Sequence, residues 1–370
     1  MVEGGRIVCV GPRGAAPEGP VDDLGDGVLL PGLVNAHTHL ELSHLGHLRA
    51  VGEKGFVAWI EGVVSALGTP PVEVRARALE AISGLVASGT AAVGDVSNQL
   101  AHLDLLDASG LEATVFFELL GWDPAQAEAV LAAADLRLAE SSGRRTRVRL
   151  AAHGPHSVSR RLFAGLAQRG GPASVHLAES PAETRFLSTG DGEWPEFLAR
   201  RGLSHVAFEP PGLSPVQYLD SLGLLKPGML AVHCVRTAPD DWTLLARRGV
   251  GVALCPRSNR NLGLGLPPVR GLLEAGVALC LGSDSLASAE TLNVLDDAAF
   301  LHRELPDLDP ALLVHMATAG GAQALGRSDL GTLEPGKRAL LAFAAAAPGL
   351  SDPLGFLVSG EAHTVEVGFS

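Results

Sequence analysis

Eight short apolar runs, each followed by a longer stretch of helical character, constrain the fold of this 370-residue chain more than any other feature. The runs are continuously apolar, as expected of strands that are covered on both faces. They lie at residues 33–37, 91–96, 114–119, 148–152, 174–177, 230–235, 251–254 and 277–281. The helical stretches include residues 72–88, 124–139, 160–168, 240–248 and 269–275. This alternation predicts an α/β chain with a parallel sheet, and eight units predict closure into a (β/α)₈ TIM barrel.

Both ends of the chain differ from this central part. Residues 1–30 and 328–370 contain glycine and proline around short strand-like pieces. We expect these two segments to pair in a small β-sandwich-like unit, and residues 31–327 to form the catalytic barrel domain. A length of 370 residues suits one barrel with such an appendage.

The net charge limits which binding partners are expected, and the cysteine pattern indicates the cellular compartment. The net charge is −13 and the pI is about 5.4, which disfavours nucleic acid and anionic membranes because they carry the same sign. The four cysteines show no C-x-x-C spacing, which favours reduced thiols in a cytoplasmic protein. No secretory signal or membrane-spanning run is expected. An aqueous small-molecule substrate is therefore expected, and a homodimer is considered because twofold dimers are the commonest symmetric assembly.

Polar residues stand where predicted strands end, and a barrel brings such ends to one face. His37 and His39 close the first run, and alternate residues of a strand point to the same side. Taken alone, this pair is equally compatible with a structural role and with metal binding. However, His176 ends the fifth run and Asp284 follows the eighth, and an aspartate beside apolar sequence is costly unless it is paired or bound to a metal. Three imidazoles and one carboxylate are suitable ligands for zinc or ferrous iron, with a position left for water.

Two further residues suit hydrolysis at such an ion. Glu179 follows His176 by three positions, and His233 lies near the end of the sixth run. A divalent ion lowers the pKa of bound water to about 7. Asp284 can then take the water proton, His233 can hold the resulting hydroxide, and Glu179 can donate a proton to a ring nitrogen of the substrate. Loss of ammonia from the tetrahedral adduct would complete a deamination.

These motifs together resemble the amidohydrolase superfamily, in its mononuclear aminohydrolase branch, over nearly the whole chain. The matching segments are residues 30–39, 153–159, 176–179, 232–233, 255–259 and 282–286. The resemblance implies a barrel with a composite β unit. It also implies metal ligation by His37, His39, His176 and Asp284, proton transfer by Glu179 and Asp284, and contact of His233 with the hydrolytic water.

The resemblance also bears on the number and type of metal ions. Branches of the superfamily with two ions bridge them by a carboxylated lysine. The lysines here are Lys54, Lys226 and Lys337, and none lies near the end of the fourth run. One ion is therefore expected. Zinc is the first candidate, with Fe²⁺ and Mn²⁺ as alternatives because their ligand preferences overlap.

Within the branch, residues 37–43, 176–190, 255–259 and 283–288 are similar to aminodeoxyfutalosine deaminases of menaquinone biosynthesis. This similarity implies an adenine nucleoside substrate that carries a carboxyphenyl ketone. A cationic side chain near the pocket is therefore expected, because it would bind the substrate carboxylate. Arg257 is the candidate, with an ion pair at the barrel rim as the alternative. His153 matches a substrate-binding position of the relatives, whereas His156 stands where another aromatic residue is more usual.

Glu41 and Trp59 are the remaining candidate substrate contacts. Glu41 is interpreted either as a substrate contact or as a structural acid. The separate nucleobase deaminases with an H-x-E motif are excluded, because the His39–Glu41 segment has no P-C-x-x-C companion. Phe56 and Trp59 could close over the substrate as a lid, or pack on the barrel mouth as part of an amphipathic helix.

The leading hypothesis is a zinc-dependent hydrolase of carbon–nitrogen bonds other than peptide bonds, which deaminates 6-amino-6-deoxyfutalosine to futalosine. Alternatives in the same superfamily are deamination of S-adenosylhomocysteine or methylthioadenosine, deamination of guanine or cytosine, and triazine hydrolysis. A different class is a catalytically silent metal-binding barrel. Glu179 and His233 beside the ligands argue against that class, because a bare metal site needs neither.

Overall fold

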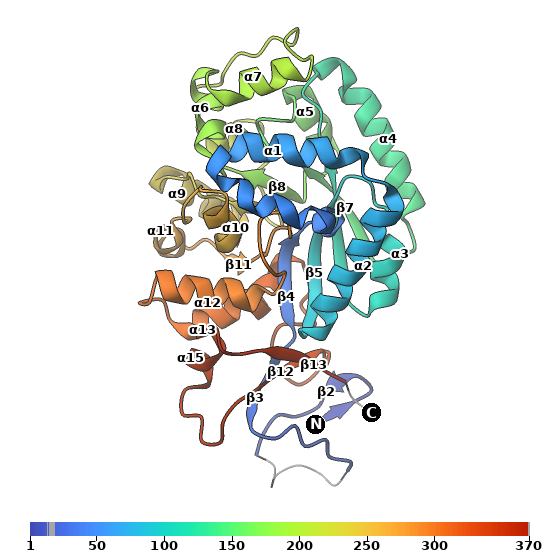
Figure 1. Ribbon diagram of the computed structural model, residues 1–370, viewed down its shortest axis with the longest axis vertical. Helices are drawn as coiled ribbons and strands as arrows, with labels where there is room; N and C mark the ends of the chain where they lie inside the picture. Colours follow the sequence, from blue (N-terminus) through green and yellow to red (C-terminus); the bar gives the residue numbers. More distant parts are fainter. Residues whose placement is uncertain (13, 15–18, 369–370) are drawn as a thin grey trace.

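A computed structural model describes residues 1–12, 14 and 19–368 of the chain, and its central feature is a parallel barrel (Figure 1). The barrel strands are β4 (Leu33–Thr38), β5 (Thr90–Ser97), β6 (Glu112–Leu119), β7 (Arg147–Ala152), β8 (Ser174–Leu177), β9 (Leu230–His233), β10 (Gly251–Leu254) and β11 (Leu279–Leu281). They pair in sequence order, each parallel to the next. A parallel bridge between Thr38 and Asp284 brings the first and last strands together. The predicted (β/α)₈ barrel is confirmed.

Close approach of the last strand to the first depends on a glycine. A Cβ atom on Gly282 would lie 2.7 Å from the Cβ of His37 and 2.9 Å from its carbonyl oxygen. No side chain fits that space without movement of the β4 backbone, because a real Cβ atom essentially never approaches another atom so closely. The same contact places the segment after β11 directly against the first predicted metal ligand.

The barrel is covered by helices, most of which follow the predicted alternation. They are α1 (Phe56–Ser65), α2 (Pro71–Ala87), α3 (Leu103–Ser109), α4 (Ala127–Glu140), α5 (Arg160–Gln168), α6 (Pro181–Thr189), α7 (Glu193–Arg200), α8 (Pro215–Ser221), α9 (Pro239–Arg248), α10 (Pro256–Asn261), α11 (Val269–Glu274), α12 (Val294–Glu304), α13 (Pro310–His315), α14 (Gly321–Ala324) and α15 (Pro353–Leu357). The 3₁₀ segments are η2 (Leu40–Lys54), which has a kink at Leu45, η3 (Ala66–Gly68) and η4 (Pro124–Gln126), and η5 (Met316–Gly320) is a π-helical turn. None of the described helices combines the length and apolar composition needed to cross a membrane.

Three apolar layers hold these elements. The largest packs the outward faces of the strands against the surrounding helices, and a second fills the barrel with smaller residues such as Ala36, Ala92 and Ala253. The third lies over the carboxyl ends of the strands and contains Phe56, Trp59, Trp122, Phe186 and Trp194. Trp59 therefore sits in an apolar cover contributed by η2, α1, α6 and α7.

The chain termini build extra antiparallel strands, as predicted. β3 (Gly27–Pro31), β12 (Leu341–Ala345) and β13 (Thr364–Val367) form one sheet in the order β13-β12-β3, and β1 (Val2–Glu3) pairs with β2 (Arg6–Ile7). The domain boundaries at residues 30/31 and 327/328 stay predictions.

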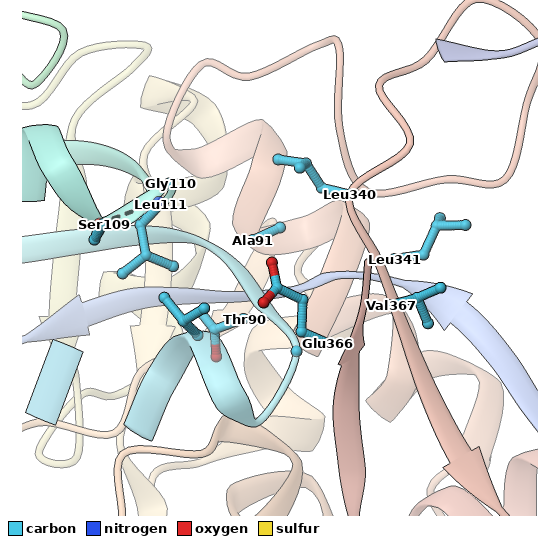
Figure 2. Close-up of a pocket in the computed structure, with 11 residues that line it drawn as sticks. Thr90, Ala91, Ser109, Gly110, Leu111, Leu340, Leu341, Glu366 and Val367 are labelled. Atoms are coloured by element: carbon cyan, nitrogen blue, oxygen red, sulfur yellow. Dashed lines mark hydrogen bonds between the residues drawn. The ribbon is translucent and has the colours of Figure 1, made fainter. Parts of the chain in front are cut away.

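A small pocket lies where this sheet meets the barrel (Figure 2). It is lined by the start of β5 and β6 and by residues near β12 and β13. Its walls include Thr90, Leu111, Leu341 and Glu366. These are the amino ends of the strands, opposite the end at which the predicted ligands stand, so this pocket is not the candidate active site.

Candidate active site

The four predicted metal ligands lie together at the carboxyl ends of β4, β8 and β11. The Nε2 atoms of His39 and His176 are 3.2 Å apart. Asp284 Oδ1 lies 3.8 Å from His37 Nε2 and 3.6 Å from His39 Nε2. All four residues are buried. The structure therefore brings side chains that are up to 247 positions apart, His37 and Asp284, to one point.

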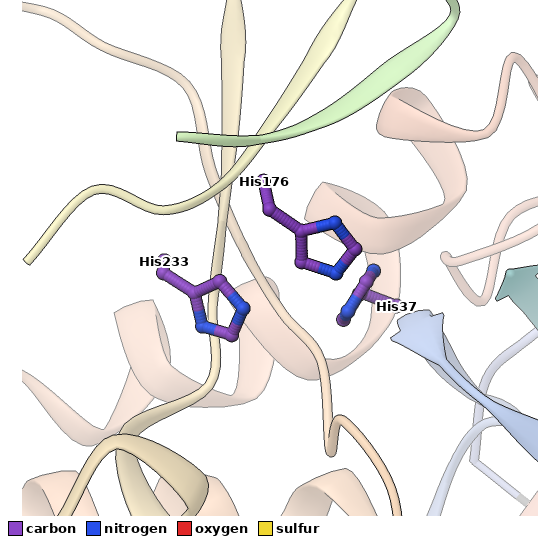
Figure 3. A group of neighbouring side chains, drawn as sticks. All are labelled: His37, His176 and His233. Atoms are coloured by element: carbon purple, nitrogen blue, oxygen red, sulfur yellow. The ribbon is translucent and has the colours of Figure 1, made fainter. Parts of the chain in front are cut away.

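His233 from β9 belongs to the same cluster, and its ring lies beside those of His37 and His176 (Figure 3). The ring centroids of His37 and His233 are 5.7 Å apart, and those of His176 and His233 are 5.5 Å apart. Candidate ligand atoms of these three histidines lie within 4.8 Å of one another, as do those of His37, His39 and Asp284. Both sets share His37, so they describe one site.

The arrangement fits a divalent cation. Two nitrogen ligands at about 2.05 Å from a tetrahedral zinc ion would lie about 3.3 Å apart, close to the 3.2 Å between His39 and His176. Neither ring nitrogen of buried His37 has a hydrogen-bond partner among the described residues. Burial lowers the pKa of His37, and it lowers the pKa of His39 to about 3. These imidazoles are therefore neutral at pH 7, the form that binds metal.

The strand ends carry unusual backbone conformations. His233 has φ of 72°, Asp284 has φ of 59° and Ala178 has φ of 51°, in the left-handed region that non-glycine residues rarely adopt. Ala178 is held by Glu183 of α6, whose carboxylate accepts hydrogen bonds from the backbone N–H groups of Ala178 at 3.1 Å and Glu179 at 2.8 Å. Such conformations persist only where the surroundings enforce them. Here they surround the candidate catalytic groups.

Asp284 uses its two oxygens differently. Oδ2 accepts hydrogen bonds from the hydroxyls of Ser258 at 2.5 Å and Ser288 at 2.9 Å, whereas Oδ1 faces His37 and His39. Burial alone would raise the pKa of Asp284, but its interactions with the neighbouring histidines outweigh burial and hold the pKa well below its usual value. Asp284 is thus a carboxylate with one oxygen directed at the histidine cluster.

Glu179 is the second buried acid at this point. Its Oε1 lies 3.4 Å from His233 Nε2, and burial raises its pKa well above the usual value. A glutamic acid that holds its proton near neutral pH can act as a proton donor. Their surroundings therefore shift the pKa values of Glu179 and Asp284 in opposite directions.

Glu118 is a residue of this site that the sequence reasoning missed. It lies near the end of β6, and its Oε1 is 3.2 Å from Nδ1 of His176. The other oxygen accepts from Asn98 at 3.0 Å. Glu118 raises the pKa of His176 to about 9 against the effect of burial, so a metal ion would displace a proton there. A carboxylate at the end of an apolar strand could have identified Glu118 as a candidate site residue. Its contact with His176 could not be predicted, because that contact depends on how the strands are arranged.

The four predicted substrate contacts have different surroundings. Glu41 accepts hydrogen bonds from Ser97 Oγ at 2.7 Å and from the backbone N–H of Asn98 at 2.8 Å, as a structural acid would. His153 lies beside the cluster, with its ring centroid 5.1 Å from that of His176 and its Nδ1 2.6 Å from Ser157 Oγ.

Arg257 and Trp59 make intramolecular contacts. Arg257 Nη2 donates to Asp297 Oδ2 at 2.8 Å and to the carbonyl oxygens of Thr291 and Asn293, which is the ion pair considered above as its alternative role. Trp59 donates its indole N–H to the carbonyl of Ala287 at 3.2 Å, which favours packing of the cover over direct contact with substrate.

His156 and Trp194 stack next to His153. The ring centroids of His156 and Trp194 are 4.2 Å apart, and those of His153 and His156 are 5.2 Å apart. The ring nitrogens of both His156 and Trp194 are buried, and none has a partner in the described part of the chain. His153, His156 and Trp194 thus form a series of neighbouring aromatic rings that begins beside His176.

Comparisons with known proteins agree with this geometry. Residues 28–367 match the model of the Amidohydrolase family. The chain is 34% identical over 355 residues to aminodeoxyfutalosine deaminase from Deinococcus radiodurans, covering 87% of this chain and 81% of the relative. It is 30% identical over 366 residues to 5-methylthioadenosine/S-adenosylhomocysteine deaminase from Pelotomaculum thermopropionicum, covering 91% and 78%.

A solved structure is similar over most of the same length. The crystal structure of Helicobacter pylori aminofutalosine deaminase in complex with methylthio-coformycin superposes with a TM-score of 0.78 at 26% identity, covering 92% of this chain and 85% of that one. The family match covers the barrel and all the residues that meet at its mouth. The chain therefore belongs to the amidohydrolase family and is a hydrolase that acts on carbon–nitrogen bonds.

Proposed function

We propose that this protein deaminates 6-amino-6-deoxyfutalosine to futalosine, a step of menaquinone biosynthesis, by adding water to an adenine-type ring. The observation that carries the proposal is the convergence of His37, His39, His176 and Asp284 beside a buried Glu179 whose pKa is raised. A site that only bound a metal ion would have no need for a buried acid with a raised pKa 3.4 Å from a histidine.

The proposed ion is zinc, held by the three imidazoles and Asp284. Three nitrogen donors and a single carboxylate suit zinc, with Fe²⁺ and Mn²⁺ as the alternatives. When bound, such an ion supplies a nucleophile by lowering the pKa of a water molecule toward about 7. The side chains of this chain perform the remaining proton transfers.

The proposed reaction divides the proton transfers between two acids. Glu179 donates its proton to the ring nitrogen next to the carbon under attack, and the water oxygen bonds to that carbon while Asp284 accepts a water proton. The ring carbon then carries both oxygen and the amino group. Asp284 passes the proton that it accepted to the amino nitrogen, the carbon–nitrogen bond breaks and ammonia leaves. The hydroxyl proton of the adduct returns to Glu179 as the ring carbonyl forms. His233 holds the attacking oxygen in line with the ring carbon throughout.

The substrate proposal is supported by two similarities. Aminodeoxyfutalosine deaminase is the name of the relative at 34% identity, and aminofutalosine deaminase is that of the solved structure with a TM-score of 0.78. Deamination of methylthioadenosine or S-adenosylhomocysteine is the second candidate, supported by relatives at 30–32% identity. Arg257 is not carried forward as the ligand of a substrate carboxylate, because Asp297 and two carbonyl groups already engage its guanidinium.

A panel of substrates tests the proposal. Purified zinc-loaded protein is incubated with 6-amino-6-deoxyfutalosine, methylthioadenosine, S-adenosylhomocysteine, adenosine, guanine, cytosine and a triazine, and ammonia and the ultraviolet spectrum are followed. The proposal expects the highest kcat/KM with the first compound. A higher value with either sulfur-containing nucleoside would replace the proposed substrate by the second candidate. No turnover of any compound would favour the silent metal-binding barrel.

A further inference from the structure

Asn259 is a buried amide that directly contacts His233. It lies in the short helix α10, and its Nδ2 is 3.0 Å from Nδ1 of His233. Asn259 is fully buried, and His233 is 1% exposed. The amide nitrogen can only donate, so Nδ1 of His233 accepts. The neighbouring Ser258 donates to Asp284. One turn of α10 thus supplies hydrogen-bond donors to both His233 and Asp284.

The proton of His233 is located by this contact. A ring nitrogen that accepts a hydrogen bond has no proton, so the His233 ring is uncharged and has one N–H group. With Nδ1 accepting from Asn259, that N–H group is on Nε2. Nε2 faces Glu179, at 3.4 Å from Oε1, and it lies on the side of the ring that faces His37 and His176 (Figure 3).

We propose that Asn259 is a positioning residue that fixes His233 as the tautomer with its proton on Nε2, so that His233 offers the attacking oxygen a hydrogen-bond donor and not a base. This inference rests on the proposed hydrolytic function. It gives each residue a separate role. Asp284 accepts the proton of the nucleophile, Glu179 donates a proton to the substrate ring, and His233 only orients the nucleophile. A neutral histidine with a free lone pair at Nε2 would compete with Asp284 for the proton.

The opposite tautomer requires a partner that accepts from Nδ1. Asn259→Asp provides one at nearly constant volume, because a carboxylate accepts hydrogen bonds and cannot donate them. The variant should therefore move the His233 proton to Nδ1, or protonate both nitrogens. Asn293→Asp is a matched control. Asn293 caps α12 by accepting from the backbone N–H of Leu295 at 2.9 Å, which an aspartate also does.

The test is nitrogen NMR of zinc-loaded protein with ¹⁵N-labelled histidine, in which the two ring nitrogens of each tautomer have distinct shifts. His233 resonances are assigned by their loss in His233→Gln. The wild type should show a protonated Nε2 and an unprotonated Nδ1, and Asn259→Asp should lose this pattern. In Asn259→Asp, kcat should fall about 10- to 100-fold with KM and zinc content unchanged, while Asn293→Asp should match the wild type.

A wild-type spectrum with the proton on Nδ1 would overturn the inference, and that measurement needs no variant to fold. An unchanged tautomer in folded Asn259→Asp would overturn it as well. Both results are independent of the substrate. Failure of the wild type to deaminate any adenine nucleoside would instead defeat the proposed function and would leave the tautomer assignment standing.

Discussion

Buried carboxylates at the two ends of the barrel have different partners. At the amino end of the strands, Glu112 is contacted by the guanidinium groups of Arg145, Arg327 and Arg338. At the carboxyl end, Glu179 and Asp284 are paired in the described part of the chain with histidines and not with arginine or lysine. Permanent positive charge neutralises the first acid. The second pair is left to imidazoles, which have no permanent charge and whose neutral form binds metal ions.

The comparison indicates that one end of the barrel is built for stability and the other for chemistry. Arg327 and Arg338 join Glu112 at the start of β6 to the chain segment that leads into β12, and so tie the terminal sheet to the barrel. The acids at the mouth are costly to bury without a cation. Substitutions at the mouth should therefore remove activity with little loss of stability, and substitutions at the base should do the reverse.

The largest effect is expected from Glu179→Gln. An amide cannot donate the proton that a glutamic acid provides, so kcat for deamination should fall by about 10²- to 10⁴-fold. Zinc content and the thermal midpoint should remain those of the wild type. The matched control is Glu196→Gln, which changes an exposed glutamate of α7. Turnover by Glu179→Gln at the wild-type rate would remove Glu179 from the mechanism.

At the opposite end, Glu112→Gln should lower the free energy of unfolding by about 3 kcal/mol. That value is the lower end of the range for breaking a buried ion pair, because Arg145 and Arg338 are partly exposed. Urea unfolding measures it, and Glu140→Gln, in an exposed pair with Arg137, should cost less than about 0.5 kcal/mol. The comparison of the two ends would fail if folded Glu112→Gln lost its deaminase activity.

A smaller effect is expected at Glu118, which orients a metal ligand. Glu118→Gln retains the shape of the side chain but weakens the interaction with His176 Nδ1. Substitutions of such carboxylate partners reduce metal affinity by about 10- to 100-fold. Competition with a zinc chelator of known affinity measures this change without reference to turnover. Unaltered zinc affinity would show that the carbonyl of His153, 3.0 Å from the same nitrogen, is sufficient to orient the ring.

The ion pairs of Glu112 also predict a pH dependence of stability at the base. Burial raises the pKa of Glu112, but the three arginines outweigh it and lower the pKa to about 2 from 4.5. Because the folded-state pKa is depressed, the stability that Glu112 contributes is complete above pH 4.5 and is lost as the pH falls toward 2. Unfolding free energies of the wild type and Glu112→Gln should converge over that range. A constant difference between them would contradict the assignment.

Much of this organisation could be predicted from the sequence. The barrel follows from eight apolar runs, and the positions of His37, His176 and Asp284 at strand ends follow from the same pattern, because parallel strands present their carboxyl ends on one face. Single contacts could not be predicted in this way. The pairing of Arg257 with Asp297 depends on how α10 and α12 lie against each other, and the contact of Asn259 with His233 depends on the direction of a side chain in α10.

The central claim is that one divalent ion at the barrel mouth supports deamination of an adenine-type ring. The most direct measurement is ammonia release from 6-amino-6-deoxyfutalosine by protein stripped with a chelator and then titrated with zinc. The account predicts no activity in the stripped protein, and recovery that is complete at one zinc per chain. Full activity in the stripped protein, or recovery that requires two ions per chain, would contradict it.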